Sequence, residues 1–229
     1  MTKATAMNVP VVATRGVIIF PGQDVMIEVG RTKSINAVNL ANDRHDAMVF
    51  IVSQKDIRVE DPAKDDLYET GTLAKIKIIR RKEGYLRVTF TGMKRARLIS
   101  LMDDGKTLSG EVAMVDDVIA DADEEVILVK RIISEFQKVS AVTASFPADV
   151  VHQLSQGVSA ITLTDQFAQY FVTDQNTKQK LLETADVNER MYLIISELEK
   201  QERMNQLESV INEKVKKKID EGQKEYYLR

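Results

Sequence analysis

Apolar and polar residues alternate along two neighbouring stretches in the first half of the chain. In "AKIKIIRR", Ala74, Ile76 and Ile78 alternate with Lys75 and Lys77, and "LRVTFTG" (86–92) shows the same alternation. A period of two half-buries a β-strand, so both stretches are predicted to be strands. The segment between them, "RKEGY", contains a glycine that suits a turn, and we therefore expect a β-hairpin.

Other apolar runs predict that most of the first segment is β structure. "VVATRGVIIFPGQDVMIEVG" (11–30) holds two runs separated by "FPG", and "DAMVFIVSQ" (46–54) holds another. Helical spacing occurs once here, in "TKSINAVNLANDR" (32–44), where Ile35 and Val38 begin an apolar stripe that Asn42 interrupts. This stretch is predicted to be a short helix.

From residue 121 the apolar period changes to that of helices. "DADEEVILVKRIISEFQKV" (121–139) begins with carboxylates, which favour a helix N-terminus. It then places four apolar residues at spacings of three or four: Val126, Val129, Ile133 and Phe136. Pro147, in "SFPAD", can open the next helix. Shorter amphipathic pieces cover 150–154, 166–171 and 175–182, so we expect a compact helical bundle.

The last helix is predicted to begin at about residue 187, because Asp186 and Glu189 have the spacing of a capping box. Continued to the end of the chain, it would be about 65 Å long at about 1.5 Å per residue, longer than the bundle can cover. Its apolar residues form two faces rotated by roughly 100° from one another, with the change at the polar "EKQER" (199–203). The first face comprises Val187, Met191, Ile194 and Leu198, and the second comprises Met204, Leu207, Ile211, Val215, Ile219 and Tyr226. We expect the first face to pack on the bundle and the second on another copy or on a module outside this sequence.

The sequence stops within this helix. A helix usually ends with Gly or Asn just past its last turn, or with Pro soon after. The final "EGQKEYYLR" offers only Gly222, which a helix tolerates at a cost of about 1 kcal/mol. We therefore expect the chain to be a piece of a longer protein.

Composition places the chain among soluble globular proteins. Of its 229 residues, 44% are hydrophobic and 29% charged. No run of 18 apolar residues and no apolar N-terminal segment occurs, so neither a membrane span nor a secretory signal is predicted. The absence of cysteine excludes a disulfide framework and thiolate chemistry. We expect a cytoplasmic location.

The net charge of −3 is unevenly distributed along the chain. Lys and Arg against Asp and Glu number 18 against 16 in residues 1–118, 5 against 10 in 119–186, and 9 against 9 in 187–229. This change favours separate modules over a nucleic-acid-binding protein, whose binding domain would be strongly basic. The predicted fold class is α+β, with a β-rich domain (1–118), a helical subdomain (119–186) and a long helix (187–229).

Five segments resemble, in this order, the N-terminal region of bacterial Lon, the ATP-dependent protease. They are "RGVIIFPGQDVMIEVGRTKS", "TGTLAKIK", "VTFTGMKRARL", "LLETADVNERMYLI" and "KVKKKIDEGQKEYYLR". The resemblance implies a PUA-like β domain, a helical subdomain and a long helix that leads to an ATPase module and a serine protease module. This sequence contains no G-x-x-x-x-G-K-[ST] phosphate loop. We therefore expect no catalytic residue and no cofactor here, and ATP and Mg²⁺ only in the ATPase module.

The function implied by the resemblance is a non-catalytic module for substrate recognition and assembly, which binds unfolded or damaged proteins within a homohexamer. An RNA-binding PUA-like module is the alternative, but the first segment nets only +2, which predicts weak binding. A free-standing enzyme is disfavoured because no paired nucleophile and base motif is present. His45 and His152 lack the spacing of metal ligands, so no metal site is predicted. Membrane and nucleic-acid partners are not expected.

Candidate substrate-binding residues follow from the matched motifs: Phe20, Pro21, Arg31, Lys33 and Met93. The alternatives without a binding role are that "FPG" is a turn and that Arg31 and Lys33 lie in a solvated loop before the helix. The second face of the last helix, from Met204 to Tyr226, is the candidate for self-association or module coupling. Three further cations, Lys94, Arg95 and Arg97, are expected on a solvent-exposed face, close to residues 80–82 across the hairpin.

Overall fold

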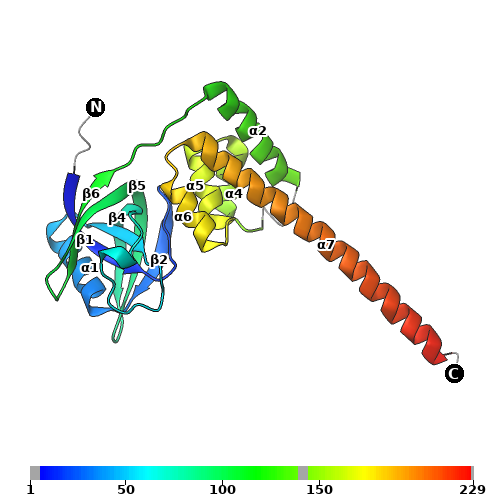
Figure 1. Ribbon diagram of the computed structural model, residues 1–229, viewed down its shortest axis with the longest axis horizontal. Helices are drawn as coiled ribbons and strands as arrows, with labels where there is room; N and C mark the ends of the chain where they lie inside the picture. The colour runs from blue at the N-terminus through cyan, green and yellow to red at the C-terminus, as the bar shows by residue number, and fades with distance from the viewer. Residues whose placement is uncertain (1–5, 139–143, 228–229) are drawn as a thin grey trace.

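The computed structural model describes residues 6–138 and 144–227, which form a strand-rich part, a helical part and a projecting helix (Figure 1). The strand-rich part holds β1 (Ala6–Thr14), β2 (Asp24–Val29), α1 (Thr32–Arg44), β3 (Met48–Ser53), a short 3-10 turn (Lys64–Asp66), β4 (Thr70–Arg81), β5 (Leu86–Asp103) and β6 (Leu108–Met114). The helices that follow are α2 (Ala122–Lys138), α4 (Ala148–Gln156), α5 (Ala160–Tyr170), α6 (Gln175–Glu183) and α7 (Val187–Tyr227). The α+β class predicted from the sequence is confirmed.

The strands form one sheet of order β2-β5-β4-β3-β1-β6, and β5 also pairs with β6, which closes five of them into a barrel. The 18-residue β5 makes this possible, because residues 86–91 pair with β2 while 96–103 pair with β6. In the pairings described, β2 is bonded only to β5 and is therefore an edge strand. Helix α1, at the predicted residues, packs on β1 and β3 and buries Ala37, Val38 and Ala41.

The predicted hairpin is formed by β4 and β5, with Ile76 opposite Phe90. The turn closes where the Lys82 N–H donates to the Tyr85 carbonyl oxygen at 3.0 Å. Gly84 has φ +82°, a left-handed conformation that glycine adopts without a steric penalty. The local alternation therefore predicted both the strands and their partner correctly.

The helical part buries its own core, and two residues from the β1–β2 connection enter it. Ile18 and Phe20 belong to the same buried cluster as Phe136, Leu163 and Phe167. The Phe20 N–H also donates to Gln169 Oε1 at 3.2 Å. Phe20 was a candidate substrate-binding residue, a role that needs an exposed side chain, and its complete burial contradicts that role.

Helix α2 forms where it was predicted, and the face that it turns to the core is centred slightly to one side of the predicted stripe. Leu128, Ile132 and Phe136 are buried, whereas Val126 is 51% exposed. The "VILVKRII" run holds two overlapping stripes that both satisfy helical spacing, and the packing of α2 against α7 and α5 selects one. Of the predicted stripe, Phe136 is buried and Val129 and Ile133 pack against the core, so only Val126 was assigned to the wrong face.

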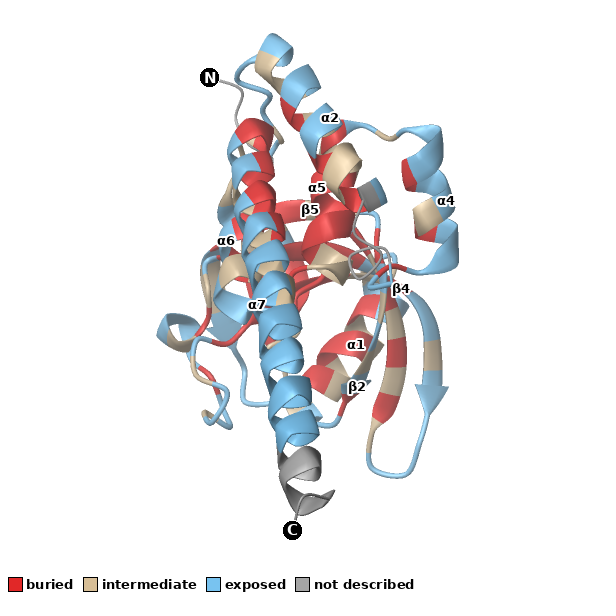
Figure 2. Ribbon diagram, turned by 90° about the vertical axis from the view of Figure 1, so that its right-hand side faces the viewer, coloured by how far each residue is buried: buried red, intermediate tan, exposed pale blue. Residues whose placement is uncertain are grey.

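Helix α7 runs unbroken for 41 residues and leaves the helical part about a third of the way along (Figures 1 and 2). Its first predicted face is confirmed, since Val187, Met191, Ile194 and Leu198 are all buried. The apolar residues further along are 47% to 56% exposed, and we call them the distal stripe: Met204, Leu207, Val210, Ile211, Val215 and Ile219. Tyr226, assigned to this face from the sequence, lies outside the residues whose side chains the structure describes. Among the helices described, none is long and apolar enough to cross a membrane.

Four charged residues from different elements meet where the barrel joins the helices, and we call them the junction cluster: Arg95 of β5, Asp117 after β6, Asp165 of α5 and Arg190 of α7. Arg95 forms a two-pronged pair with Asp165, with Nη1 to Oδ2 at 3.1 Å, and its Nη1 lies 3.3 Å from Asp117 Oδ1. Arg190 pairs with Asp117 and lies 3.6 Å from Asp165. The cluster therefore ties the barrel, the linker and two helices together.

Three of the four residues of the junction cluster are buried, and Asp117 is 23% exposed. Arg95, Arg190 and Asp165 are at most 2% exposed. Backbone carbonyls complete the shell, since Arg95 Nε donates to Leu182 at 3.2 Å and Arg190 Nε donates to Thr184 at 2.7 Å. Burial raises the pKa of Asp165, and the hydrogen bond from Arg95 opposes that rise.

The basic cluster predicted around the hairpin does not form. Arg95 lies opposite Thr72 and Arg97 lies opposite Thr70, whereas Arg80 lies opposite Arg87 at the other end of the hairpin. The two groups of cations are thus at opposite ends of the same strands. The prediction of a single solvent-exposed basic face is wrong, most clearly for Arg95, which is buried under the helices.

Candidate functional site

The outward surface of β2, β5 and β4 carries an apolar row between two charged rows. Met26 of β2 lies opposite Thr89 of β5, which lies opposite Ile78 of β4. Met26 is 58% and Ile78 is 44% exposed. Since neighbouring strands lie about 4.8 Å apart, Met26 and Ile78 are about 10 Å apart, and the Thr89 side chain lies between them in one strip across the strands. We call this strip and its flanking rows the outer face.

Charged pairs hold both flanks of the outer face. On one side, Asp24 accepts hydrogen bonds from Lys77 Nζ and Thr91 Oγ1, each at 2.5 Å. These bonds, the one from Lys77 first, lower the pKa of Asp24 below its ordinary value. On the other side, Arg87 donates to Glu28 at 2.6 Å. The apolar row is thus set between fixed ion pairs, with the free edge of β2 beside it.

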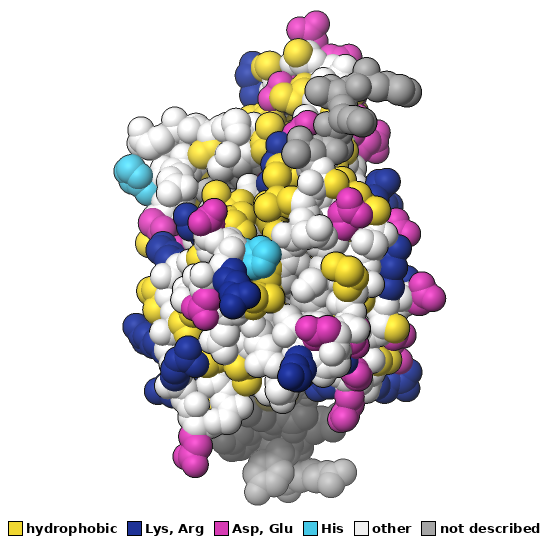
Figure 3. All heavy atoms as spheres, turned by 90° about the vertical axis from the view of Figure 1, so that its left-hand side faces the viewer, with side chains coloured by type: hydrophobic (Ala, Val, Ile, Leu, Met, Phe, Trp, Pro, Cys, Tyr) yellow, Lys and Arg dark blue, Asp and Glu magenta, His cyan; other side chains and the backbone are white. Residues whose placement is uncertain are grey.

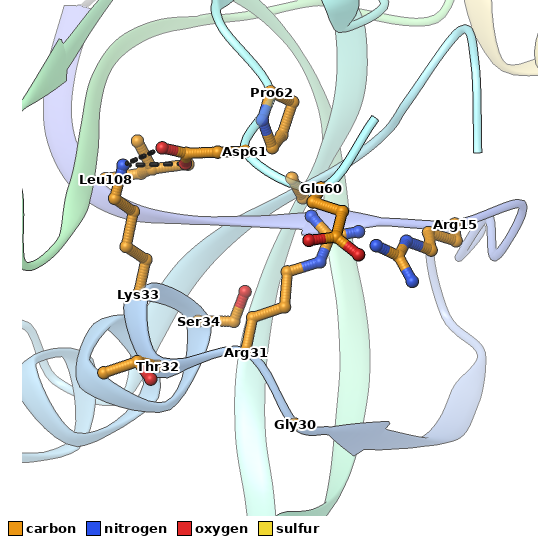
Figure 4. A pocket seen from close by; sticks show the side chains of 11 residues that line it. Arg15, Gly30, Arg31, Thr32, Lys33, Ser34, Glu60, Asp61, Pro62 and Leu108 are labelled. Carbon is orange, nitrogen blue, oxygen red and sulfur yellow. Dashed lines mark hydrogen bonds and ion pairs between the residues drawn. The ribbon is translucent and has the colours of Figure 1, made fainter. Parts of the chain in front are cut away.

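A cavity of about 430 Å³ opens next to β2, at the start of α1 (Figure 4). We call it the arginine cavity, and its charged lining residues are Arg15, Arg31, Lys33, Glu60 and Asp61. A second cavity of about 370 Å³ shares Arg15, Gly30 and Arg31 with it and extends along residues 27–29 of β2. Together they make a continuous hollow from the edge strand to the loop that holds Glu60.

The two ends of the arginine cavity differ in charge balance. Lys33 Nζ reaches Asp61 Oδ1 at 2.7 Å and Asp103 Oδ2 at 2.6 Å, and these bonds raise the pKa of Lys33. Arg31 donates to the neutral amide oxygen of Gln54. Burial first, and then the charge of Arg15, lower the pKa of Arg31. Lys33 therefore forms direct ion pairs with carboxylates, whereas Asp61 and Glu60 act on Arg31 only from a longer range.

The residues proposed from the sequence as substrate contacts separate into two groups. Arg31 and Lys33 line the same cavity. Pro21 and Met93 lie near one another, because the Gly22 N–H donates to the Gly92 carbonyl oxygen at 2.8 Å. Met93 is exposed on β5, beyond the apolar row. Phe20 is removed from the surface, and the turn reading of "FPG" holds, since the Gln23 N–H donates to the Phe20 carbonyl oxygen at 3.2 Å.

Several residues of these surfaces escaped the sequence interpretation. Ile78 was placed on the half-buried face with Ala74 and Ile76, but a register shift between Ile76 and Ile78 turns it outward. Arg15 opens the first matched motif but was not proposed as a contact. Alternation along β2 alone could have indicated that Met26 points outward, because it shares parity with Asp24 and Glu28. Nothing local could have indicated Arg15, because its neighbours in space come from residues 30–34 and 60–62.

Charge on the barrel end is mixed. Figure 3 shows Lys and Arg interspersed with Asp and Glu on this face, with apolar patches between them. A nucleic-acid-binding surface would present a continuous basic field. Among the residues described, no three His, Cys, Asp or Glu side chains converge to hold a metal ion.

Residues 8–200 match the family model described as the ATP-dependent protease La (LON) substrate-binding domain. The chain belongs to this Lon family. Lon protease 1 of Hydrogenovibrio crunogenus is 34% identical over 222 residues, covering 96% of this chain and 27% of that protein. Lon protease of Escherichia coli K12 is 30% identical over 227 residues, covering 99% of this chain and 29% of that protein. The chain thus spans less than a third of the length of these Lon relatives.

Solved structures agree on the fold. The N-terminal domain of a Mycobacterium avium complex Lon protease superimposes with a TM-score of 0.67 at 22% identity, covering 84% of this chain and 98% of that one. A Lon N-terminal domain protein from Xanthomonas campestris gives 0.57 at 14% identity. The Lon family model ends at residue 200, just after the last buried residue of α7, Leu198, so the distal stripe lies beyond the matched region.

Proposed function

We propose that this chain is the client-recognition module of an ATP-dependent Lon-type protease. It binds unfolded or damaged proteins and passes them to an ATPase module and a serine protease module, which use ATP and Mg²⁺, in a cytoplasmic homohexamer. The observation that carries the proposal is the outer face, an exposed apolar row beside an unpaired strand edge on a domain of the Lon substrate-binding family.

The outer face suits unfolded polypeptides for a physical reason. Unfolded segments present apolar side chains and unpaired backbone groups, and native proteins bury both. Met26 and Ile78 offer apolar surface, and the edge of β2 offers backbone donors and acceptors. The fixed ion pairs on both flanks keep the row open, because Lys77 and Arg87 are held by Asp24 and Glu28.

Affinity for one module is expected to be weak. Completing the burial of a half-exposed Met or Ile gains about 1 kcal/mol, half of the roughly 1.5–3 kcal/mol for a full side chain. Two such residues and a few backbone bonds place the dissociation constant of a single site above about 1 μM, once the entropy of ordering the client is included. Several copies in one assembly strengthen binding through effective concentration.

Titration of a labelled, permanently unfolded protein against the chain, with its native form in parallel, tests the proposal. The unfolded form binds more tightly, and the Met26→Gln/Ile78→Gln variant binds it about 10- to 30-fold more weakly, since about 2 kcal/mol is lost. The matched control is Ile99→Gln/Met102→Gln, which changes the same exposed residue types on the far half of β5. Equal affinity for both forms, or equal loss in both variants, contradicts the proposal.

RNA titration and ATP hydrolysis supply two further arms. Salt-sensitive RNA binding without binding of unfolded protein would favour the RNA-binding alternative. Saturable ATP hydrolysis by the purified chain would contradict a purely recognising role.

A further inference from the structure

The arginine cavity holds two guanidinium groups that form no ion pair with the described residues. Arg15 follows β1 and Arg31 precedes α1, so two separate segments bring them to one hollow. Figure 4 shows their side chains turned toward one another. Arg15 makes no hydrogen bond or ion pair with any described residue, and Arg31 has only the uncharged oxygen of Gln54. Burial and the charge of Arg15 lower the pKa of Arg31, and the more distant charges of Asp61 and Glu60 offset this only in part.

The carboxylates around the cavity leave this imbalance in place. Asp61 and Asp103 are both drawn to Lys33 at the opposite end. Glu60 lies beside the two guanidiniums in Figure 4, but among the described residues it forms no ion pair within 4 Å. At the arginine end neither guanidinium thus has a carboxylate at ion-pair distance among the described residues, although Asp61 and Glu60 act on Arg31 from further away.

Such a pair of guanidiniums is suited to a particular ligand. The planar fork of arginine matches a carboxylate with two parallel hydrogen bonds, and an anion between two arginines relieves their repulsion. A cavity of about 430 Å³ has room for a carboxylate together with the residue that carries it. The adjoining cavity leads along residues 27–29 of β2, so a polypeptide that reaches the carboxylate position also runs beside the edge strand.

We propose that the arginine cavity binds one carboxylate of a client polypeptide between Arg15 and Arg31. The carboxylate comes from a chain terminus or from an Asp or Glu side chain, and Glu60 competes with it for the same cations. The inference rests on the proposed client-binding function, to which it adds a preference for segments that carry an acidic group near their apolar residues. In this arrangement Arg31 binds the client carboxylate, and Lys33 forms the ion pair that keeps Asp61 away from it.

The test compares one fluorescent unfolded peptide in three forms: with a free C-terminal carboxylate, with a C-terminal amide, and with its internal Glu changed to Gln. The wild-type chain loses about tenfold in affinity when the carboxylate that it binds is removed, and the modified form that binds more weakly identifies the source of that carboxylate. Arg15→Gln abolishes this preference without loss of folding, since Arg15 is exposed and unpaired. Glu60→Gln increases the affinity for the acidic form severalfold. Arg97→Gln, an exposed arginine on β5 outside the cavity, leaves the preference intact.

A second measurement separates this inference from the proposed function. N-acetylalanine and its amide are titrated while the side-chain Nε–H signals of Arg15 and Arg31 are followed by NMR. A saturable shift with the acid alone supports the carboxylate site even if unfolded proteins do not bind. Identical responses to the acid and the amide, or equal peptide affinities in wild type and Arg15→Gln, would overturn it. Loss of binding to all peptides in Met26→Gln/Ile78→Gln, with the NMR shift retained, locates the two contributions on separate surfaces.

Discussion

Asp165→Asn is the sharpest single perturbation of the junction cluster. The substitution keeps the shape of the side chain but removes one of two negative charges that balance Arg95 and Arg190. Both guanidiniums are buried, and the one carboxylate left to them, Asp117, is 23% exposed. A positive charge would then stay in a buried site, since an arginine does not release its proton.

The expected cost is large because a buried pair is broken on one side only. Removing one partner of such a pair costs about 3–5 kcal/mol, whereas an exposed pair contributes about 0–1 kcal/mol. For a chain of this size about 1 kcal/mol corresponds to about 2–4 °C in melting temperature, so the variant is expected to melt roughly 6–20 °C lower. Asp56→Asn, which breaks the exposed pair with Arg58, is the control and leaves the unfolding free energy nearly unchanged.

Urea unfolding followed by circular dichroism measures these differences. The double variant Arg95→Met/Asp165→Leu removes both charges and keeps apolar volume, so it is expected to be more stable than Asp165→Asn. Hydrogen exchange of the variants then reports whether the barrel and α5 unfold in one cooperative step or separately. The reasoning is refuted if Asp165→Asn unfolds within 1 kcal/mol of the wild type, or if the double variant is as unstable as the sum of its single variants.

Three further outcomes follow from other parts of the molecule. Gly92→Ala is expected to destabilise the chain by about 1–3 kcal/mol or more in thermal unfolding, because a Cβ there would lie 2.2 Å from the Phe20 carbonyl oxygen; an unchanged melting temperature would contradict that packing. Asp24→Asn should make the free energy of unfolding less dependent on pH in acid. The folded pKa of Asp24 lies below its unfolded value near 3.8, so its contribution to stability is present above that pH and is lost as the pH falls through the folded pKa. Urea midpoints of the variant that fall as steeply as those of the wild type between about pH 5 and 2.5 would contradict this role of Asp24. Changing three distal-stripe residues to Glu should convert a dimer to a monomer with hydrogen exchange of the barrel unaltered, as sedimentation and hydrogen exchange would show; a wild type that is itself monomeric would contradict self-association and leave module coupling as the role of the stripe. The three changes are Leu207→Glu, Ile211→Glu and Val215→Glu.

Features set by local patterns could be predicted from the sequence. The hairpin, α1 and the buried first face of α7 depend on alternation or spacing within a few residues, and each was placed correctly. The fate of Arg95 could not be predicted in this way, because the groups that bury it come from residues 117, 165 and 190. Its side chain sits on the outside of the barrel, where an exposed arginine is the ordinary expectation.

The candidate surfaces show the same division. Arg31 and Lys33 were identified from the sequence, but Arg15 was missed because only the fold brings it to the cavity. Phe20 was misjudged for a related reason, since a phenylalanine before a turn is exposed or buried according to what packs over the turn. Here α5 does so, from a position 149 residues further along the chain.

The sequence separation between Phe20 and Gln169 delays their contact while the chain is being synthesised. The Phe20 N–H finds Gln169 only after 149 further residues have been made, which takes roughly 7–30 s at about 5–20 residues per second. Until α5 exists, a completed barrel presents Ile18 and Phe20 to solvent and leaves Arg95 without Asp165. A nascent chain of this length thus passes through a stage in which it carries the same exposed apolar signature that marks unfolded proteins for capture.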